Sequence, residues 1–311
     1  MPIHTPAPRP TVRGPRFGAI PGLRLNYVQS VRWVVTRLDL FATSDVTNPE
    51  SMKESTELAL FYCFASLYQP SLAKRELRAI RQFLSQWLSD RLLAEWLLKC
   101  PGHYSPSAIA YLAMRATGIR IAAFEDVLSR LQSAGFPHCL ELTPYRSMEL
   151  EYILWKSGLG SHKPAMGSHF RASSFALVRN PVYLTQSEVY SITHTLLYLT
   201  DFAGPCRLPV RVRQRGIDMV RALLVHYRRI RDWDITGELL LNLIGLDSDN
   251  DPLFTATLRA LCVAQRNDGA VPGPNYCATD AHADDREYIF KHCYHTTLVS
   301  MILWAACLKD S

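Results

Sequence analysis

The segment SITHTLLYLTDF, residues 191–202, carries three polar side chains whose spacing would let them act together. On a helix His194, Tyr198 and Asp201 stand at i, i+4 and i+7, so they share one face. An imidazole, a phenol and a carboxylate on one face can relay a proton or bind a metal ion. The alternative is a buried hydrogen-bond network that joins this helix to the next. All three are candidate catalytic residues, and His194 and Asp201 are also candidate metal ligands.

A second histidine lies in the polar segment of residues 267–308. His292 and His295 stand at i and i+3, one turn apart, early in a helix that becomes strongly apolar. Two imidazoles at this spacing can bind one metal ion or one anion, and the alternative is a core histidine beside an exposed one. Asp284 is expected to be the N-cap of this helix. His295 is therefore a candidate catalytic residue and metal ligand.

Two charged segments are the remaining candidates for binding a substrate or a partner. In residues 143–158, Arg146 and Glu149 stand at i, i+3 and Glu151 lies on a different face, so one of the two carboxylates is expected to pair with Arg146 and the other to point inward. An exposed ion pair is the default for such residues. Residues 207–232 hold eight arginines, which form either a solvated helical face or a docking patch for an acidic partner such as a carrier protein.

The elements that position these residues are expected to be helices. Apolar residues recur at spacings of three and four along most of the chain, and alternating strand patterns are almost absent. We therefore predict an all-α fold of about 11 or 12 helices, packed as antiparallel pairs in an α/α toroid or a barrel-like array; a solenoid or an irregular bundle is the alternative. Two long connections, Gly158–Leu184 and Arg266–Asp284, are expected to be functional. The expected helices run over residues 49–67, 71–88, 91–100, 106–117, 144–157, 186–200, 209–227, 233–244, 252–265 and 285–308.

Composition bounds the class of protein. The chain has 311 residues, of which 48% are hydrophobic and 20% charged, as in an ordinary globular protein. Residues 1–24 hold six prolines and four arginines without an acid, so we expect a disordered arm followed by a single helical domain over residues 25–311. Without the arm the net charge falls from +6 to about +2, which argues against nucleic-acid binding.

The compartment is expected to be the cytoplasm. No apolar run is long enough to span a membrane, and no secretory signal is recognised at the N-terminus. The eight cysteines form no CxxC pair and several lie in apolar helical runs, so free thiols are expected rather than a disulfide framework.

The C-terminal pattern AQRNDGAVPGP followed by YHTTLVSMILWAACL is similar to one repeat of the α/α-toroid superfamily, which includes squalene cyclases and the β subunits of protein prenyltransferases. Gln265, Asp268 and Gly269 match the Gln-x-x-Asp-Gly turn of those repeats. Tyr294-His295-Thr296 resembles the prenyltransferase element that supplies a zinc-ligand histidine. The resemblance implies a divalent metal such as zinc as cofactor. The aromatic residue that usually follows the turn is missing, and no Asp-x-Cys ligand pair is visible.

The chain as a whole resembles an uncharacterised actinobacterial family found near natural-product gene clusters. The segments PYRSMELEYIL, SITHTLLYLTDF and DGAVPGP…YHTTL carry this resemblance. It implies a tailoring role in secondary metabolism.

Two hypotheses from different classes follow. The first is a tailoring enzyme of the lyase, cyclase or transferase kind, which acts on a small or carrier-bound metabolite in a central pocket through metal-assisted or acid/base chemistry. Its catalytic residues would be His194, His295, Asp201 and Tyr198, and its substrate-binding residues Arg146, Glu149, Asp268 and Tyr294. The second is a non-catalytic helical scaffold that binds an acidic partner, such as a carrier protein, through the arginine-rich segment.

Overall fold

The computed structural model describes residues 22–41, 52–68, 71–103, 108–160, 162–163, 165–204 and 206–309. These residues form fifteen α-helices and contain no strand, so the prediction of an all-α fold is confirmed. The helices are α1 (Leu23–Val35), α2 (Leu38–Phe41), α3 (Lys53–Tyr68), α4 (Lys74–Leu88), α5 (Arg91–Lys99), α6 (Ile109–Ala116), α7 (Ala122–Ser133), α8 (Pro144–Lys156), α9 (Ser168–Ala172), α10 (Ser174–Leu177), α11 (Gln186–Leu199), α12 (Val210–Ile230), α13 (Trp233–Gly245), α14 (Pro252–Ala264) and α15 (Arg286–Leu308), with the 3-10 helices η1 (Pro101–His103) and η3 (Pro181–Tyr183).

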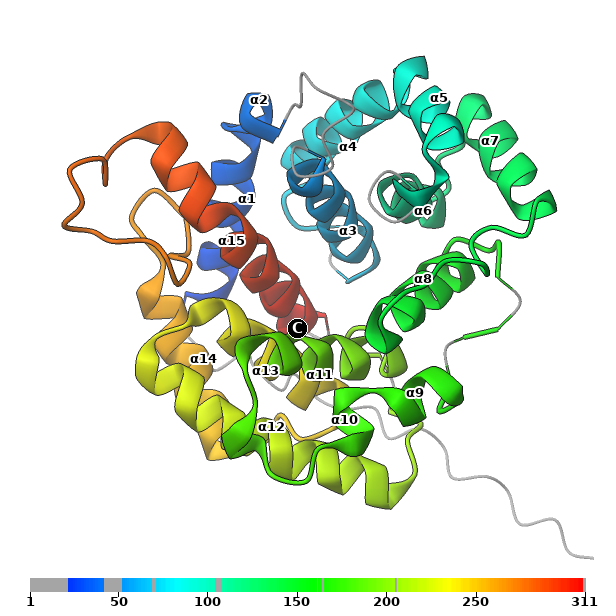
Figure 1. Cartoon of the computed structure of the whole chain (residues 1–311). Helices are drawn as coiled ribbons and strands as arrows, with labels where there is room; N and C mark the ends of the chain where they lie inside the picture. Colours follow the sequence, from blue (N-terminus) through cyan, green and yellow to red (C-terminus); the bar gives the residue numbers. More distant parts are fainter. Residues whose placement is uncertain are drawn as a thin grey trace, which may run out of the picture.

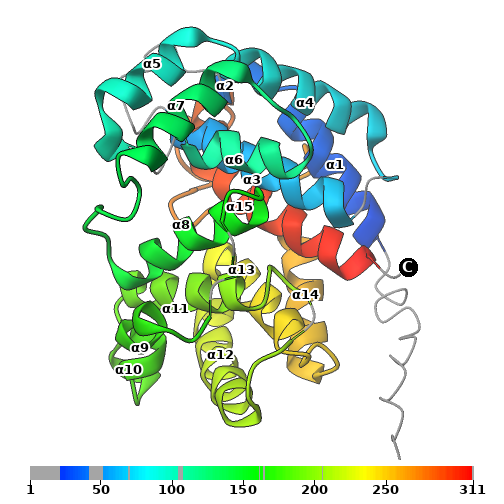
Figure 2. The same cartoon turned by 90° about the vertical axis from the view of Figure 1, so that its right-hand side faces the viewer.

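Six of these helices touch one another in a closed order. α3 contacts α6, α6 contacts α8, α8 contacts α11, α11 contacts α13, α13 contacts α15, and α15 contacts α3 again. We call this set of six the inner ring. α1 packs against α15, α4 against α3, α9 against α8, α10 against α11, and both α12 and α14 against α13. Figure 1 shows these partner helices on the outside of the inner ring. In the perpendicular view, α4, α5 and α7 lie at the top and α9, α10 and α12 at the bottom (Figure 2).

The share of buried residues distinguishes inner-ring helices from an outer helix. In α15, 16 of 23 residues are buried, and in α13, 11 of 13 are buried. A helix that is apolar on all sides must be covered on all sides, which suits a place in the inner ring. The outer helix α4 buries a single stripe, at Leu77, Ile80, Leu84 and Leu88.

Several predicted helix ends are confirmed. α11 begins at Gln186 and α8 at Pro144, as predicted, and Thr185 and Glu188 form a capping box at the start of α11. The prediction that Asp284 caps the last helix is wrong. Asp285 is the N-cap, because it has extended dihedral angles and its carboxylate accepts hydrogen bonds from the backbone N–H groups of Glu287 and Tyr288.

Helices were missed where their patterns are short or interrupted. α1, α2 and α7 are not among the expected helices, and the connection of residues 158–184 contains α9, α10 and η3. α1 begins at Leu23, inside the expected arm, whereas residues 1–21 lie outside the described residues. The expected starts of the helices at residues 49 and 106 also lie outside them.

The connection between α14 and α15 is held against α1. The Gln265 side-chain amide donates hydrogen bonds to the backbone oxygen of Asn26 at 2.9 Å and to Ser30 Oγ at 2.8 Å. Gly269 has φ +99°, and a Cβ atom there would lie 2.5 Å from the backbone oxygen of Gln29. The turn therefore requires glycine for both its dihedral angles and its close approach to α1.

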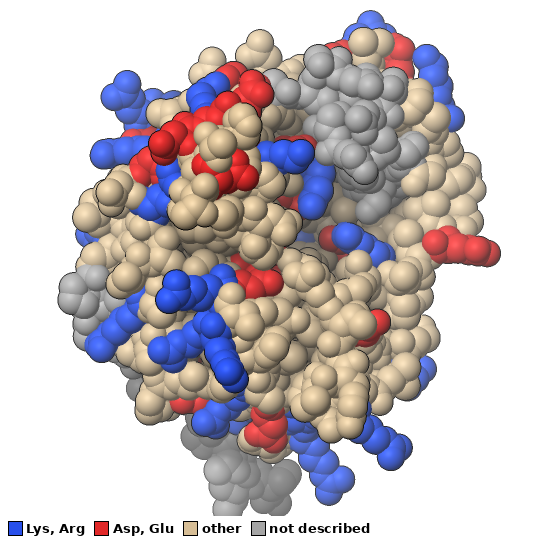
Figure 3. Space-filling view, turned by 60° about the vertical axis from the view of Figure 1, so that its left-hand side comes forward, with Lys and Arg blue, Asp and Glu red and all other residues tan. Residues whose placement is uncertain are grey.

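Surface and covalent features are ordinary. The eight cysteines are all free. Among the described helices, none has the length and apolar character needed to cross a membrane. Acidic and basic side chains both occur on the face shown in Figure 3, so that face does not carry one sign of charge.

Candidate functional site

Five titratable side chains from four inner-ring helices lie together. Glu57 comes from α3, His194 from α11, Asp234 and Glu238 from α13, and His295 from α15. Ion-pair distances and mutual electrostatic effects connect them. We call this set the histidine–carboxylate cluster. It brings together His194 and His295, the two histidines that were predicted to be catalytic. Asp234 and Glu238 stand at i, i+4, so they present neighbouring carboxylates on α13, and each lies close to one of the two rings.

His295 is the charged centre of the cluster. Its Nδ1 atom lies 2.7 Å from Glu57 Oε2, and its Nε2 atom lies 3.3 Å from Asp234 Oδ1. Burial opposes a charge on the imidazole, but the Asp234 and Glu57 carboxylates outweigh burial and raise the pKa of His295 to about 10. Burial likewise opposes a charge on Glu57, and the His295 imidazolium reverses this effect and lowers the pKa of Glu57. His295 is therefore an imidazolium at neutral pH.

His194 has a partner of a different kind. Its Nδ1 atom lies 2.8 Å from the backbone oxygen of Tyr190, and a carbonyl oxygen can only accept, so Nδ1 carries the proton. In the neutral ring this leaves a lone pair on Nε2, which forms no hydrogen bond among the described residues. The rings of Tyr145, Tyr190 and Tyr198 surround the imidazole, with centroids 6.1, 6.1 and 6.0 Å away. His194 therefore presents a free basic nitrogen in an aromatic setting.

The carboxylates of Asp234 and Glu238, on α13, lie on the buried side of the two histidines. Glu238 Oε2 lies 3.5 Å from His194 Nδ1 and accepts a hydrogen bond from the Thr193 hydroxyl. Burial raises the pKa of Glu238. Asp234 Oδ2 accepts a hydrogen bond from the Tyr190 hydroxyl at 2.5 Å. Both carboxylates are thus fixed in place by neighbouring hydroxyl groups.

Water reaches one side of the cluster. The side chains of His295, His194 and Glu57 are 31%, 25% and 19% exposed, whereas those of Asp234 and Glu238 are 3% and 4% exposed. All five come from the inner ring, so the accessible surface of the histidines borders a space that solvent can enter. Two water-accessible imidazoles that lie against two buried carboxylates are suited to proton transfer with a bound molecule.

A chain of polar contacts extends the cluster to α8. The Tyr198 hydroxyl donates a hydrogen bond to Glu149 Oε1 at 2.9 Å, and Arg146 donates one to Glu149 Oε2 at 2.7 Å. Glu149 thus both pairs with Arg146 and points inward, where two separate carboxylates had been expected. Glu151 instead is exposed, with its carboxylate 3.4 Å from His169. The sequence-predicted residues Arg146, Glu149 and Tyr198 are therefore brought beside His194.

Asp201 is bound elsewhere. Its carboxylate accepts hydrogen bonds from Tyr152 at 2.6 Å and Lys156 at 2.7 Å. The described residues contain no group of three or more His, Cys, Asp or Glu side chains placed to hold a metal ion. The predicted metal ligands His194, His295 and Asp201 are consequently not brought together as one metal site, because a lysine neutralises Asp201.

The remaining predicted residues have other partners. Asp268 accepts a hydrogen bond from Trp33 Nε1 at 3.2 Å and lies 3.5 Å from Arg37, so it helps to hold the turn on α1. The His292 ring lies 4.4 Å from the Tyr288 ring and is not linked to His295 by any described contact. Tyr294 is buried next to the cluster, where burial and the Glu57 carboxylate raise its pKa.

Sequence reasoning missed the three carboxylates. Glu57 is an acid within the apolar segment ELALFYCF, and Asp234 and Glu238 stand at i, i+4 in the most apolar helix of the chain. An acid in such a helix must be buried, and buried acids are paired. The sequence therefore indicated that these acids are buried and paired. It did not indicate their partners, because the partner of each acid lies on a helix distant in the chain.

The chain was compared with known proteins. A family model described as a domain of unknown function, DUF6895, matches residues 27–305, so the chain belongs to this family. No curated protein and no solved structure shows significant similarity to it.

Proposed function

We propose that this member of the DUF6895 family is an enzyme that performs acid/base chemistry on a small or carrier-bound metabolite held inside the inner ring. One observation carries the proposal: His194, whose Nε2 atom has no hydrogen-bond partner among the described residues, and the imidazolium of His295 belong to one water-accessible cluster. A ring nitrogen without a partner that can accept a proton, and a positive charge in the same cluster, are parts that a proton-transfer reaction needs.

The roles follow from the partners of each ring. His194 Nε2 removes a proton from the bound metabolite, and the resulting imidazolium is stabilised by Glu238, whose carboxylate lies 3.5 Å from Nδ1. His295 supplies positive charge where negative charge develops on the substrate. Return of the proton at a second position gives an isomerisation or cyclisation, and loss of a leaving group gives an elimination. Tyr198, Glu149 and Arg146 orient the substrate.

The finer parts of the proposal rest on sequence resemblance. The closed order of alternating inner and outer helices supports assignment to an α/α toroid. The tailoring role in secondary metabolism, the actinobacterial family near natural-product gene clusters and the cytoplasmic compartment are proposed from the sequence. A transferase reaction is compatible with the same pair of histidines.

The scaffold alternative is favoured by one feature of α12. Arg211, Arg228 and Arg229 form no ion pair among the described residues, whereas Arg213 and Arg221 pair with Asp247 and Asp251 at 3.9 and 3.0 Å. Unpaired arginines on an outer helix can bind an acidic carrier protein. Charge reversal at Arg228 and Arg229 would abolish capture of such a carrier, and capture that survives the reversal would exclude this alternative.

Proton transfer can be tested without knowing the substrate. We would incubate the purified protein with a small-molecule extract of its source organism in D₂O and follow masses by mass spectrometry. Wild-type protein is expected to add deuterium to, or change the mass of, specific metabolites, and His194→Gln is expected to lose this activity. His226→Gln, the same change at an exposed residue of the outer helix α12, is the matched control. Unchanged metabolites with the wild type, or full activity of His194→Gln, would exclude the proposal.

A further inference from the structure

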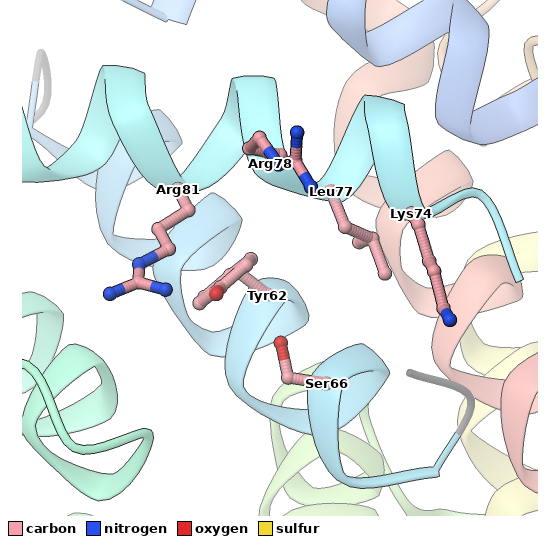
Figure 4. Close-up of a pocket in the computed structure, with 6 residues that line it drawn as sticks. All are labelled: Tyr62, Ser66, Lys74, Leu77, Arg78 and Arg81. Carbon is pink, nitrogen blue, oxygen red and sulfur yellow. The ribbon is translucent and has the colours of Figure 1, made fainter. Parts of the chain in front are cut away.

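A hollow of about 290 Å³ lies between α3 and α4, apart from the histidine–carboxylate cluster. Figure 4 shows Arg81 and Lys74 reaching from α4 on either side of Tyr62 and Ser66, which come from α3. The hollow is lined by Tyr62, Ser66, Lys74, Leu77, Arg78 and Arg81. The lining thus has three cationic side chains, two hydroxyl groups and no carboxylate.

The cations share one flank of α4. Lys74, Arg78 and Arg81 stand at i, i+4 and i+7, which places them in one row beside the buried stripe. All three are exposed, and none forms an ion pair with another described residue. The acid of this helix, Glu76, lies on another side, where it pairs with Arg32 at 3.2 Å. Three like charges in one row repel one another, and a bound anion would remove that repulsion.

Two uncharged hydroxyl groups, which can donate hydrogen bonds, line the α3 side of the hollow. Tyr62 is only 7% exposed and Ser66 is half-buried, and both face the hollow from α3. A hydroxyl group can donate a hydrogen bond to an anion oxygen, and the guanidinium groups of Arg78 and Arg81 can each donate two parallel ones. The row from Lys74 to Arg81 spans about 10 Å along the helix axis, at roughly 1.5 Å per residue.

We propose that this hollow binds a phosphate-bearing anion, and that the length of its cationic row selects a diphosphate over a single phosphate. Guanidinium groups match the geometry of phosphate oxygens, and an ammonium group adds a point charge at one end. A solvated flank with no ligand is the competing explanation. The site is independent of the acid/base chemistry, because it lies on a different side of α3 from Glu57.

The test measures binding of inorganic pyrophosphate to the full chain by isothermal titration calorimetry at constant ionic strength. One pyrophosphate per chain is expected, with orthophosphate and the non-phosphate dianion malonate at least about tenfold weaker. Arg81→Gln and Arg78→Gln should each weaken pyrophosphate binding about tenfold, the usual effect of removing one charge-assisted hydrogen-bonding group.

Arg75→Gln is the matched control. It makes the same change on the same helix, at an exposed residue that does not line the hollow, and it should leave the affinity unchanged within about twofold. No binding of pyrophosphate, equal affinity for malonate, or equal loss in Arg75→Gln would each overturn the proposal. Because all three arginines are exposed, melting temperatures close to that of the wild type are expected and confirm that each variant is folded.

Discussion

Two histidines of the same cluster have partners of different kinds. The Nδ1 atom of His194 faces a backbone carbonyl, which requires a proton on that nitrogen and places the lone pair on Nε2. His295 instead lies between the carboxylates of Glu57 and Asp234, which favour its charged form. The difference comes from the surroundings, and it would allow His194 to act as a base while His295 supplies positive charge.

The charge on His295 makes stability depend on pH. Its pKa of about 10 in the folded chain exceeds its ordinary value of 6.5, so its contribution to stability is fully present below pH 6.5 and is lost as pH rises toward 10. We expect this contribution to be about 2 kcal/mol once water at the exposed third of the ring is allowed for. The free energy of unfolding by urea, measured between pH 6 and pH 10, should fall more steeply for the wild type than for His295→Gln.

His292→Gln is the control for this measurement, because His292 lies one turn away and contacts a tyrosine ring rather than a carboxylate. Its pH dependence should match that of the wild type. A His295→Gln variant that shows the same pH dependence as the wild type would mean that His295 is not charged in the folded chain.

The sequence predicted the histidines of the site but not their partners. His194 and Tyr198 share a face because they are four residues apart, and such local spacing can be counted from a sequence. Glu57 and His295 are 238 residues apart, and their contact depends on how α3 and α15 close the inner ring. Asp201 does not continue the predicted face of His194 and Tyr198, because α11 ends at Leu199 and Asp201 has φ +53°. Its partner Lys156 lies on α8.

At the scale of elements, some helix starts can be predicted to within a residue, as at α8, α11 and α14, whereas α4 begins at Lys74 and not at residue 71. The sequence DDRE offers two aspartates as the cap of α15, and the geometry selects Asp285. Asp285→Ala should lower the free energy of unfolding by about 1 kcal/mol, since it removes the acceptor for two N–H groups of the first turn. Asp284→Ala should have no measurable effect. Equal destabilisation by the two variants, measured by urea unfolding, would contradict the assignment of the cap.

The Gln-x-x-Asp-Gly turn makes a second test of an element. Gly269→Ala should destabilise the protein by about 3 kcal/mol, because the new Cβ atom would meet the backbone of α1 and the residue would also have to keep a positive φ. Gly135→Ala is the matched control, since Gly135 has φ +90° and open space around it. It should cost only about 1 kcal/mol, from the dihedral angle alone. Thermal unfolding of both variants separates steric clash from backbone strain, and equal losses would show that α1 does not pack on the turn.

At the scale of the whole molecule, the closed order of the inner ring is what the sequence could not supply. Apolar periodicity predicts that a helix is buried, but it does not say which helix lies next to it. The high apolar content of α13 and α15 indicated buried helices, whereas the contact between α3 and α15 brings together parts of the chain from opposite ends. The inner ring therefore emerges from long-range packing, and the site forms only when that packing is complete.

This dependence predicts an uneven distribution of stability. α15 buries 16 of its 23 residues and contacts α1, α3 and α13, so its amide hydrogens should exchange only when the whole chain unfolds. The segment of residues 168–183 forms two short helices and one 3-10 helix on the outside, and within them Phe175 is the single buried residue. Its amides should exchange by local opening, at least about a hundredfold faster than those of α15.

Hydrogen–deuterium exchange followed by mass spectrometry measures both segments in one experiment. Asp285→Ala provides an internal check, because exchange of the α15 core should accelerate by the same factor as global unfolding. Protection of residues 168–183 equal to that of α15 would mean that the outer layer is as integral to the fold as the inner ring.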